Sequence, residues 1–400
     1  MSLDCTNDEM RSVTVHSLMR VANRLQGLAQ SEIRRMTREC ERVGGINLGQ
    51  GICDLPTPPL VRDGAIAAIR ENRSTYSFAE GARELRDAIA RKLARDNGLQ
   101  ADPAAEICVT VGASGAYTAA IHALLDAGDG ILLFEPYYGY HLNAAVVAGL
   151  TPEFATLRPP EFTLREDALE AAITSRTRAV VVCTPSNPSG KMFRSDELEA
   201  LARVARRHDL LVITDEIYEY IRYDGRPHLS PAAVAGLRER TLTIMGLSKT
   251  FSITGWRLGY TVAPAEMTRA ITLVNDLYFV CAPTPLQLGA ARGFDAPRSY
   301  FDELQSGYQR KRDRICAALR RAGLEPIVPE GAYYVLADCA RLGFKTSLQA
   351  AMHVLETTGV ASVPGSAFYR GAEGEKLLRF CFAKDDEVLD LACARLAALG

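Results

Sequence analysis

The chain has 400 residues, of which 48% are hydrophobic and 24% are charged, and its formal net charge is -2. This composition is typical of a folded globular protein of two or three domains and excludes a disordered chain. The nearly neutral charge provides no general attraction to nucleic acid or to an anionic membrane, so we expect neither as a partner.

The ten cysteines are scattered singly. They form no CxxC pair and lack the spacing to histidine of a zinc site, which indicates reduced thiols and predicts no metal site. The segment from Met1 to Met10 lacks the basic start and apolar core of a signal peptide, and no apolar run approaches the roughly 18 residues of a membrane span. We therefore expect a cytoplasmic protein.

Short β-branched runs alternate with helical stretches along the first two thirds of the chain. Residues 195–208 place apolar side chains at helical spacing and arginines on the opposite side, which predicts a crossover helix. The alternation predicts an α/β fold with a mostly parallel sheet covered by helices on both faces. The predicted strands are residues 107–111, 131–134, 179–184, 211–214, 241–245 and 258–262.

After about residue 290 the pattern changes. A long polar helix is predicted near residues 301–321, followed by strands near 333–337 and 377–382 and a closing helix from Asp385. This order of elements indicates a second, smaller α+β domain.

The most specific segment runs from Gly246 to Tyr260 and sets Lys249 eight positions before Arg257, amid small and apolar residues. An amine condenses with a carbonyl only when it is neutral, and a nearby guanidinium can bind a phosphate and lower the pKa of the lysine by like-charge repulsion. Ser248 can reach the same phosphate. The segment predicts a site for a phosphorylated aldehyde.

Two further segments follow predicted strands. Residues 112–117 open a helix, so their backbone N–H groups and the Ser114 hydroxyl could hold a phosphate, although such a turn is commonly only a turn. Tyr138 offers an aromatic face that could stack on a heteroaromatic ring. Its alternative role is packing within a loop.

Three polar side chains could surround such a ring. The amide of Asn187, in a proline-punctuated turn, could donate to a phenolate oxygen. Asp215 ends a predicted strand and Tyr218 follows three residues later, so both could reach one ring. A carboxylate that keeps a pyridine nitrogen protonated makes the ring an electron sink. Glu216 is expected to face away and to serve the structure.

Arg379 is buried among the alternating apolar residues of a predicted strand. A buried guanidinium costs several kcal/mol unless an anion pairs with it, and its planar fork matches a carboxylate. A substrate carboxylate is one candidate partner, and an internal salt bridge is the alternative.

Taken together, these segments resemble the fold type I pyridoxal-phosphate enzymes of the class I/II aminotransferase family, and most of all its kynurenine and glutamine transaminase branch. The resemblance runs from Asn47-Leu-Gly-Gln-Gly51 through Tyr76 and Gly81 to Arg379-Phe-Cys-Phe-Ala-Lys-Asp385. It implies an aspartate aminotransferase-like fold, with a large cofactor-binding domain at residues 57–290. The small domain would come from both chain ends, residues 1–56, which also supply the substrate loop, and residues 291–400.

The resemblance also implies a role for each motif residue. Lys249 would carry pyridoxal 5'-phosphate as an aldimine and move the proton between the substrate Cα and the cofactor, while Asp215 would pair with the pyridine nitrogen. Tyr76 would reach the phosphate of the neighbouring subunit, which implies a homodimer. The cofactor-binding residues would be Ser114, Gly115, Ala116, Tyr138, Asn187, Asp215, Tyr218, Ser248, Lys249, Arg257 and Tyr76, and the substrate-binding residues Gly51, Asn187 and Arg379.

The implied function is transfer of the amino group of an L-α-amino acid to a 2-oxo acid, through a pyridoxamine phosphate intermediate, in amino acid metabolism. The alternative is a lyase, cyclase or oxidase that uses the same cofactor and quinonoid intermediate, since electron-sink chemistry belongs to the cofactor. Two departures concern the pocket. Gly246 stands where many relatives have a phosphate-binding hydroxyl, and Cys53 replaces a proline of the substrate loop.

Overall fold

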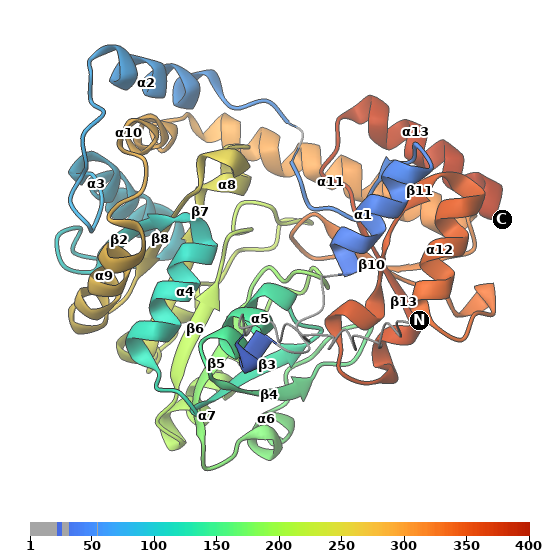
Figure 1. Ribbon diagram of the computed structural model, residues 1–400, viewed down its shortest axis with the longest axis horizontal. Coiled ribbons are helices and arrows are strands. Elements are labelled where there is room, and N and C mark those ends of the chain that lie inside the picture. The colour runs from blue at the N-terminus through green and yellow to red at the C-terminus, as the bar shows by residue number, and fades with distance from the viewer. Residues whose placement is uncertain (1–21, 26–31, 54) are drawn as a thin grey trace, which may run out of the picture.

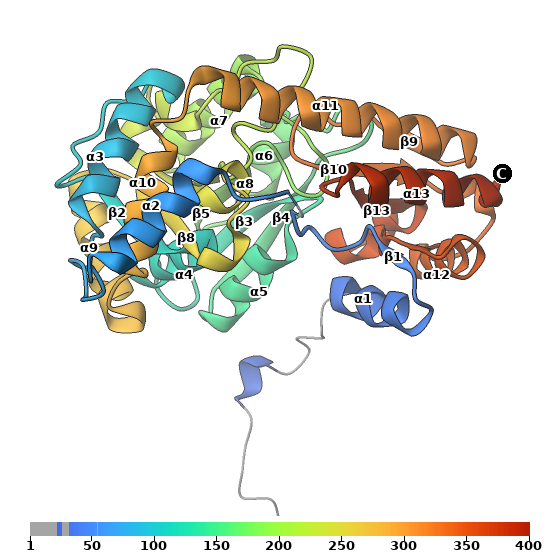
Figure 2. The same cartoon turned by 90° about the horizontal axis from the view of Figure 1, so that it is seen from above.

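The computed structural model describes residues 22–25, 32–53 and 55–400. Figure 1 shows two lobes, with the large domain on the left and the small domain on the right. Seen from above, α11 (Arg298–Arg321) runs along the molecule and joins the two lobes (Figure 2).

The large domain is built on a seven-stranded sheet in the order β2-β8-β7-β6-β5-β3-β4. β8 alone runs opposite to the other six strands, which confirms the predicted mostly parallel sheet. The strands are β2 (Ile107–Val111), β3 (Gly130–Glu135), β4 (Thr151–Thr156), β5 (Thr177–Cys183), β6 (Leu211–Asp215), β7 (Thr241–Gly246) and β8 (Leu258–Val262).

The strand β4 is absent from the sequence-based prediction. Its six residues include Pro152 and lack a β-branched run, so they do not read as a strand. Because β4 is an edge strand of the sheet, a residue without a backbone N–H is tolerated there.

Helices cover both faces of this sheet, as predicted. Val180 and Val182 of β5 pack with Leu198 and Leu201 on one face, whereas Val181 packs on the other face. This alternation is the two-residue period of a strand buried on both sides. The helices of this domain are α2 (Pro59–Arg70), α3 (Arg83–Lys92), α4 (Gly112–Leu124), α5 (Gly139–Val147), α6 (Glu166–Ala172), α7 (Ser195–Arg207), α8 (Leu247–Thr250), α9 (Ala265–Phe279) and α10 (Thr284–Gly293).

The small domain contains a four-stranded antiparallel sheet in the order β12-β13-β10-β9. β1 (Ile46–Asn47) pairs with β11 (Val360–Ala361), so a segment near the start of the chain joins the C-terminal part, as expected. Its other elements are α1 (Glu32–Arg42), β9 (Glu325–Ile327), β10 (Tyr334–Asp338), α12 (Ser347–Thr358), β12 (Val363–Pro364), β13 (Leu377–Cys381) and α13 (Asp386–Leu396).

The described residues contain neither a membrane-spanning helix nor a metal-binding cluster. Within residues 22–25, 32–53 and 55–400, none of the helices is long and apolar enough to cross a bilayer. The same part of the chain contains no cluster of histidine, cysteine and acidic side chains that could hold a metal ion.

Candidate active site

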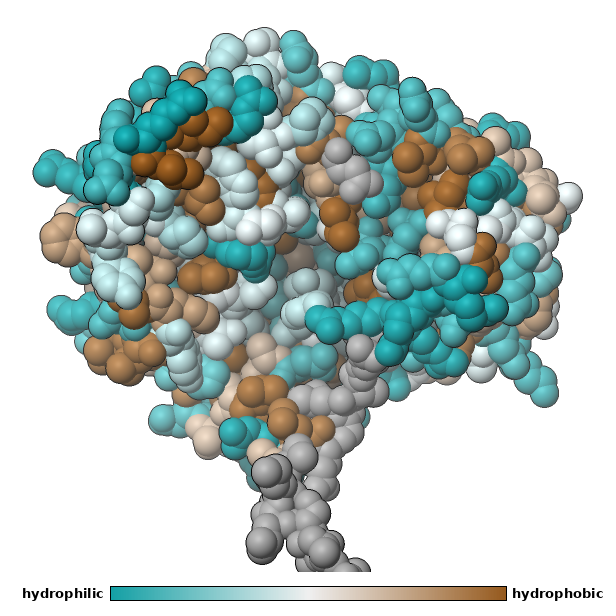
Figure 3. Space-filling view, turned by 45° about the horizontal axis from the view of Figure 1, so that its top comes forward, coloured by the Kyte–Doolittle hydropathy of each residue, from teal (hydrophilic) through white to brown (hydrophobic). Residues whose placement is uncertain are grey.

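The predicted site residues come from the carboxyl ends of neighbouring strands of the large sheet. β6 ends at Asp215, Asn187 follows β5, and Tyr138 follows β3. Because parallel strands present their carboxyl ends at one edge, these side chains meet in the crevice at that edge. The space-filling view shows the surface hollowed near its middle, between the two lobes (Figure 3).

Lys249 lies in the short helix α8, directly after β7. Its Nζ is 3.3 Å from the carbonyl oxygen of Gly51 and 5.3 Å from the ring centre of Tyr333. Burial lowers the pKa of Lys249, and the guanidinium of Arg257 lowers it further. Both causes increase the fraction of neutral amine, which is the reactive form.

Asp215 is paired with a histidine that the sequence analysis did not single out. His141, from α5, donates from Nε2 to Oδ2 of Asp215 at 3.0 Å, and both side chains are buried. A carboxylate only accepts hydrogen bonds, so the histidine nitrogen must be the donor. The bond holds the carboxylate in one orientation. In the sequence, the only sign of His141 is its place three residues after Tyr138.

Arg379 of β13 is 1% exposed and makes two hydrogen bonds. Nη1 donates to Oδ1 of Asn187 at 2.8 Å, and Nη2 donates to the carbonyl oxygen of Gly49 at 2.7 Å. The guanidinium lies over the rings of Tyr334, at 4.4 Å, and Phe368, at 4.8 Å.

The third guanidinium nitrogen of Arg379, Nε, is buried without a hydrogen-bond partner in the described part of the chain. No ion pair of Arg379 is found among those residues either, so they do not supply the internal salt bridge that was the alternative. A buried cation with a free donor provides a binding site for an anion.

Three tyrosines lie beside Lys249 and Arg379. The hydroxyl of Tyr218 lies 3.4 Å from that of Tyr334, and the hydroxyl of Tyr333 donates to the Gly51 carbonyl at 3.0 Å. Burial raises the pKa of Tyr218 well above its ordinary value, so its hydroxyl stays protonated and can donate. Tyr333 and Tyr334 were predicted only as part of a strand.

Tyr138 is partly buried and lies beside these groups. Its ring stacks on Tyr140 with centres 5.2 Å apart and meets His141 edge-on at 5.2 Å. Because His141 binds Asp215, Tyr138 and Asp215 both contact this one histidine.

Arg257 lies over the first turn of α4. A Cβ atom on Gly112 would come within 2.8 Å of its Nη2, and Gly112 has a φ of +69°, so both space and backbone conformation require glycine. Ser114, Gly115 and Ala116 follow in this turn, and the Ser114 hydroxyl is exposed. Backbone N–H groups at a helix start together with a guanidinium form an anion site.

Two positions singled out in the sequence, Gly246 and Tyr76, differ from the rest in their surroundings. Gly246 packs beneath Ile217, since a Cβ there would lie 2.9 Å from its Cγ2, so any side chain at this position would displace Ile217. Tyr76 is 80% exposed, so the described part of the chain leaves most of this side chain uncovered.

The chain matches known aminotransferases over most of its length. The family described as aminotransferase class I and II matches residues 43–396. Rat kynurenine–oxoglutarate transaminase 3 is 33% identical over 93% of this chain and 88% of its own length. The structure of N-succinyldiaminopimelate aminotransferase from Mycobacterium tuberculosis has a TM-score of 0.92 at 35% identity, covering 95% of this chain and 100% of that one. A Thermus thermophilus aspartate aminotransferase double mutant has a TM-score of 0.88 at 34% identity, covering 96% and 100%.

These matches confirm the predicted family and fold, and they do not favour the lyase, cyclase or oxidase alternative. The chain therefore belongs to the class I and II aminotransferases, and it is a pyridoxal-phosphate-dependent enzyme that transfers an amino group between an amino acid and a 2-oxo acid.

Proposed function

We propose that the enzyme moves the amino group of an L-α-amino acid with Lys249 as the acting base and Arg379 as the carboxylate site. The observation that carries this proposal is Arg379, a buried cation with a free Nε whose two bonded partners, Asn187 and the Gly49 carbonyl, are both neutral. An α-carboxylate matches this fork and compensates its buried charge.

The residues present fit pyridoxal phosphate. When bound, this cofactor supplies a carbonyl for amines and a ring that accepts the electrons released at the substrate Cα. The cradle formed by α4 and Arg257 suits its phosphate, with Ser114, Gly115, Ala116 and Ser248 as further contacts. Asp215 suits the pyridine nitrogen, Asn187 and Tyr218 suit the ring oxygen, and Tyr138 suits the ring face.

Lys249 moves the proton. Its lowered pKa leaves the amine free to accept a proton from the substrate Cα and to return it at the cofactor C4' carbon, on the other side of the substrate nitrogen. The Gly51 carbonyl at 3.3 Å accepts a hydrogen bond from Nζ and orients the amine, while Tyr333 holds that carbonyl from the other side.

The substrate class follows from the carboxylate site. The relatives are named for different substrates, kynurenine, N-succinyldiaminopimelate and aspartate. An α-carboxylate is common to all α-amino acids, so we propose an L-α-amino acid as donor and a 2-oxo acid as acceptor, in amino acid metabolism.

We also propose a cytoplasmic homodimer. Large apolar side chains are exposed on α9, with Leu273 at 63%, Leu277 at 75% and Tyr278 at 52%, and on the loop before α3, with Tyr76 at 80% and Phe78 at 75%. The amide of Asn275 in α9 donates to the Ala79 carbonyl at 3.2 Å, which ties the two segments together. Exposed apolar patches of this kind mark interfaces.

In this dimer Tyr76 of each chain completes the phosphate site of the other. The proposed domains are residues 57–290 for cofactor binding and 1–56 with 291–400 for the small domain. The pairing of β1 with β11 supports this division.

The experiment that tests the function mixes cofactor-loaded protein with pooled amino acids in the absence of any 2-oxo acid. We expect the aldehyde form of the cofactor to be lost, and its aminated form and one equivalent of 2-oxo acid to appear. Absorbance measures the change in the cofactor, and mass spectrometry identifies the 2-oxo acid. Ammonia, a cyclised product or peroxide in place of the 2-oxo acid would contradict transamination.

A further inference from the structure

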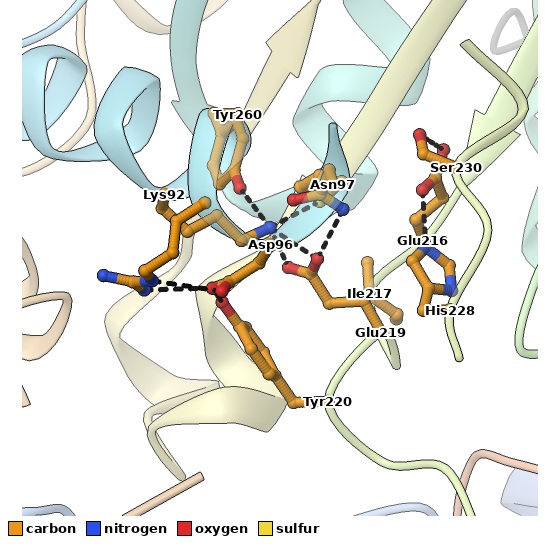
Figure 4. Close-up of polar contacts among 12 residues, drawn as sticks. Lys92, Asp96, Asn97, Glu216, Ile217, Glu219, Tyr220, His228, Ser230 and Tyr260 are labelled. Carbon is orange, nitrogen blue, oxygen red and sulfur yellow. Dashed lines mark hydrogen bonds and ion pairs between the residues drawn. The ribbon is translucent and has the colours of Figure 1, made fainter. Parts of the chain in front are cut away.

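From Asp215, the last residue of β6, into the turn that follows, two proposed ring-binding side chains alternate with two structural carboxylates. Asp215 binds His141, and Tyr218 faces Tyr334. Glu216 and Glu219, one residue after each of these, are buried at 0% and 7% exposure and bind different partners. Figure 4 shows the two carboxylates reaching separate groups of polar side chains (Figure 4).

The first of these groups surrounds Glu219. Lys92, the last residue of α3, is fully buried and donates from Nζ to both carboxylate oxygens of Glu219, with the Oε2 contact at 2.5 Å. Asn97 donates from Nδ2 to the same oxygen at 2.9 Å, and Nζ of Lys92 also lies 3.5 Å from the hydroxyl of Tyr260 in β8. Glu219 is therefore joined to elements on both sides of the turn.

The second group surrounds Glu216. Its Oε1 accepts from Oγ1 of Thr214 at 2.6 Å and from Oγ of Ser230 at 3.0 Å, and its Oε2 accepts from Nε2 of His228 at 2.7 Å. All three donors come from within the large domain. The carboxylate is thus fixed on both oxygens.

We propose that Lys92 and His228 are positioning residues that, through Glu219 and Glu216, hold the turn so that Asp215 and Tyr218 face the cofactor ring. This inference rests on the proposed roles of Asp215 and Tyr218.

The physical reason for assigning these residues a positioning role is the free-energy cost of burying a charge. Well-packed apolar residues often stabilise a core as well as a buried ion pair does, whereas an ion pair also specifies one geometry. Here Glu219, the partner of Lys92, directly follows Tyr218 in the chain. Contacts that fix the turn on this side therefore set where the ring-binding groups stand, and binding sites tolerate little displacement.

Replacing both members of each anchor with uncharged residues tests the proposal, because it leaves no unpaired charge. The variants are Lys92→Met/Glu219→Gln and His228→Asn/Glu216→Gln. The matched control is Lys311→Met/Asp386→Asn, since Lys311 is a buried lysine of the small domain that donates to Asp386 at 3.0 Å. Each variant is compared with the wild type by the melting temperature of its apoenzyme and by its dissociation constant for pyridoxal phosphate. The visible absorption of the bound cofactor is then compared in the cofactor-loaded proteins.

We expect both anchor variants to fold, to bind the cofactor about 10-fold more weakly and to shift its absorption, as loss of outer partners does at metal sites. The control should change neither property. Wild-type affinity and absorption in both folded anchor variants would overturn the proposal. If the first double variant does not fold, Lys92→Arg, which displaces the cation, takes its place, and wild-type affinity there would also overturn it.

Asp215→Asn, measured in the same way, separates this proposal from the proposed function. A change in Asp215→Asn alone shows that only the anchors are misassigned. No change in Asp215→Asn shows that the assignment of Asp215 itself is wrong.

Discussion

Arg379 and Asn187 lie 192 positions apart in the chain and are joined by a hydrogen bond of 2.8 Å from Nη1 to Oδ1. Arg379 belongs to β13 of the small domain, and Asn187 belongs to the turn after β5 of the large domain. The proposed carboxylate site is therefore assembled from both domains, so we expect their relative position to affect substrate binding.

Replacing Arg379 should affect substrate binding more than chemistry. We expect Arg379→Ala to raise the KM for the amino acid by about 100-fold, because a bond to a charged group is worth about 1.5–3 kcal/mol. Arg379→Lys, which keeps the charge but loses the fork, should recover only part of this. Steady-state kinetics measure both, and an unchanged KM in Arg379→Ala would place the carboxylate elsewhere.

Replacing Lys249 should remove the reaction itself. We expect Lys249→Ala to lower kcat by on the order of 10⁴-fold, the upper range for loss of a general acid–base group. The variant should still bind the cofactor through the phosphate and ring contacts. Lys345→Ala, which removes an exposed lysine, is the control, and near-normal turnover in Lys249→Ala would refute the assignment.

The lowered pKa of Lys249 should make the apoenzyme's stability depend on pH. Between the lowered pKa in the folded state and the ordinary value of 10.5, the unfolded chain binds a proton that the folded chain does not. The free energy of unfolding therefore rises with pH across this window. Lys249→Met lacks this dependence, so it should exceed the wild type in stability at neutral pH, with the difference closing toward pH 10.5. Denaturant titrations of the two apoenzymes at several pH values test this, and a constant difference would contradict it.

His141 should matter through Asp215. We expect His141→Asn to weaken pyridoxal phosphate binding by about 10-fold, since the Asp215 carboxylate loses a charge-assisted bond. Fluorescence titration of the apoenzyme gives the dissociation constant. His208→Asn, at a partly exposed histidine paired with Glu170, should bind normally, and equal affinities in the two variants would show that His141 does not act on the cofactor site.

The proposed dimer can be broken at α9. We expect Leu273→Asp/Leu277→Asp to give monomers in sedimentation velocity, because charges on an apolar interface lose their solvation. Loss of the partner's Tyr76 should also weaken cofactor binding. Leu391→Asp, on an exposed face of α13, should stay dimeric, and a dimeric α9 variant would place the interface elsewhere.

Much of the fold could be predicted from the sequence, because local patterns carry it. The β-branched runs give β5 to β8 to within two residues, and the spacing of Lys249 and Arg257 predicts the proposed cofactor site, since both follow from neighbouring residues. The strand β4 was not predicted from the sequence. It forms a strand because of its place at the edge of the sheet and not because of its composition.

Only the tertiary structure decided which distant groups complete the site. His141 on Asp215, the Gly49 carbonyl on Arg379 and Tyr333 beside Lys249 are contacts between segments far apart in the chain. A lone histidine, a loop carbonyl or a strand tyrosine has no periodic signature. The sequence by itself therefore determined the family and predicted the proposed reacting groups, which lie in local motifs, whereas packing of the two domains determined how those groups are oriented.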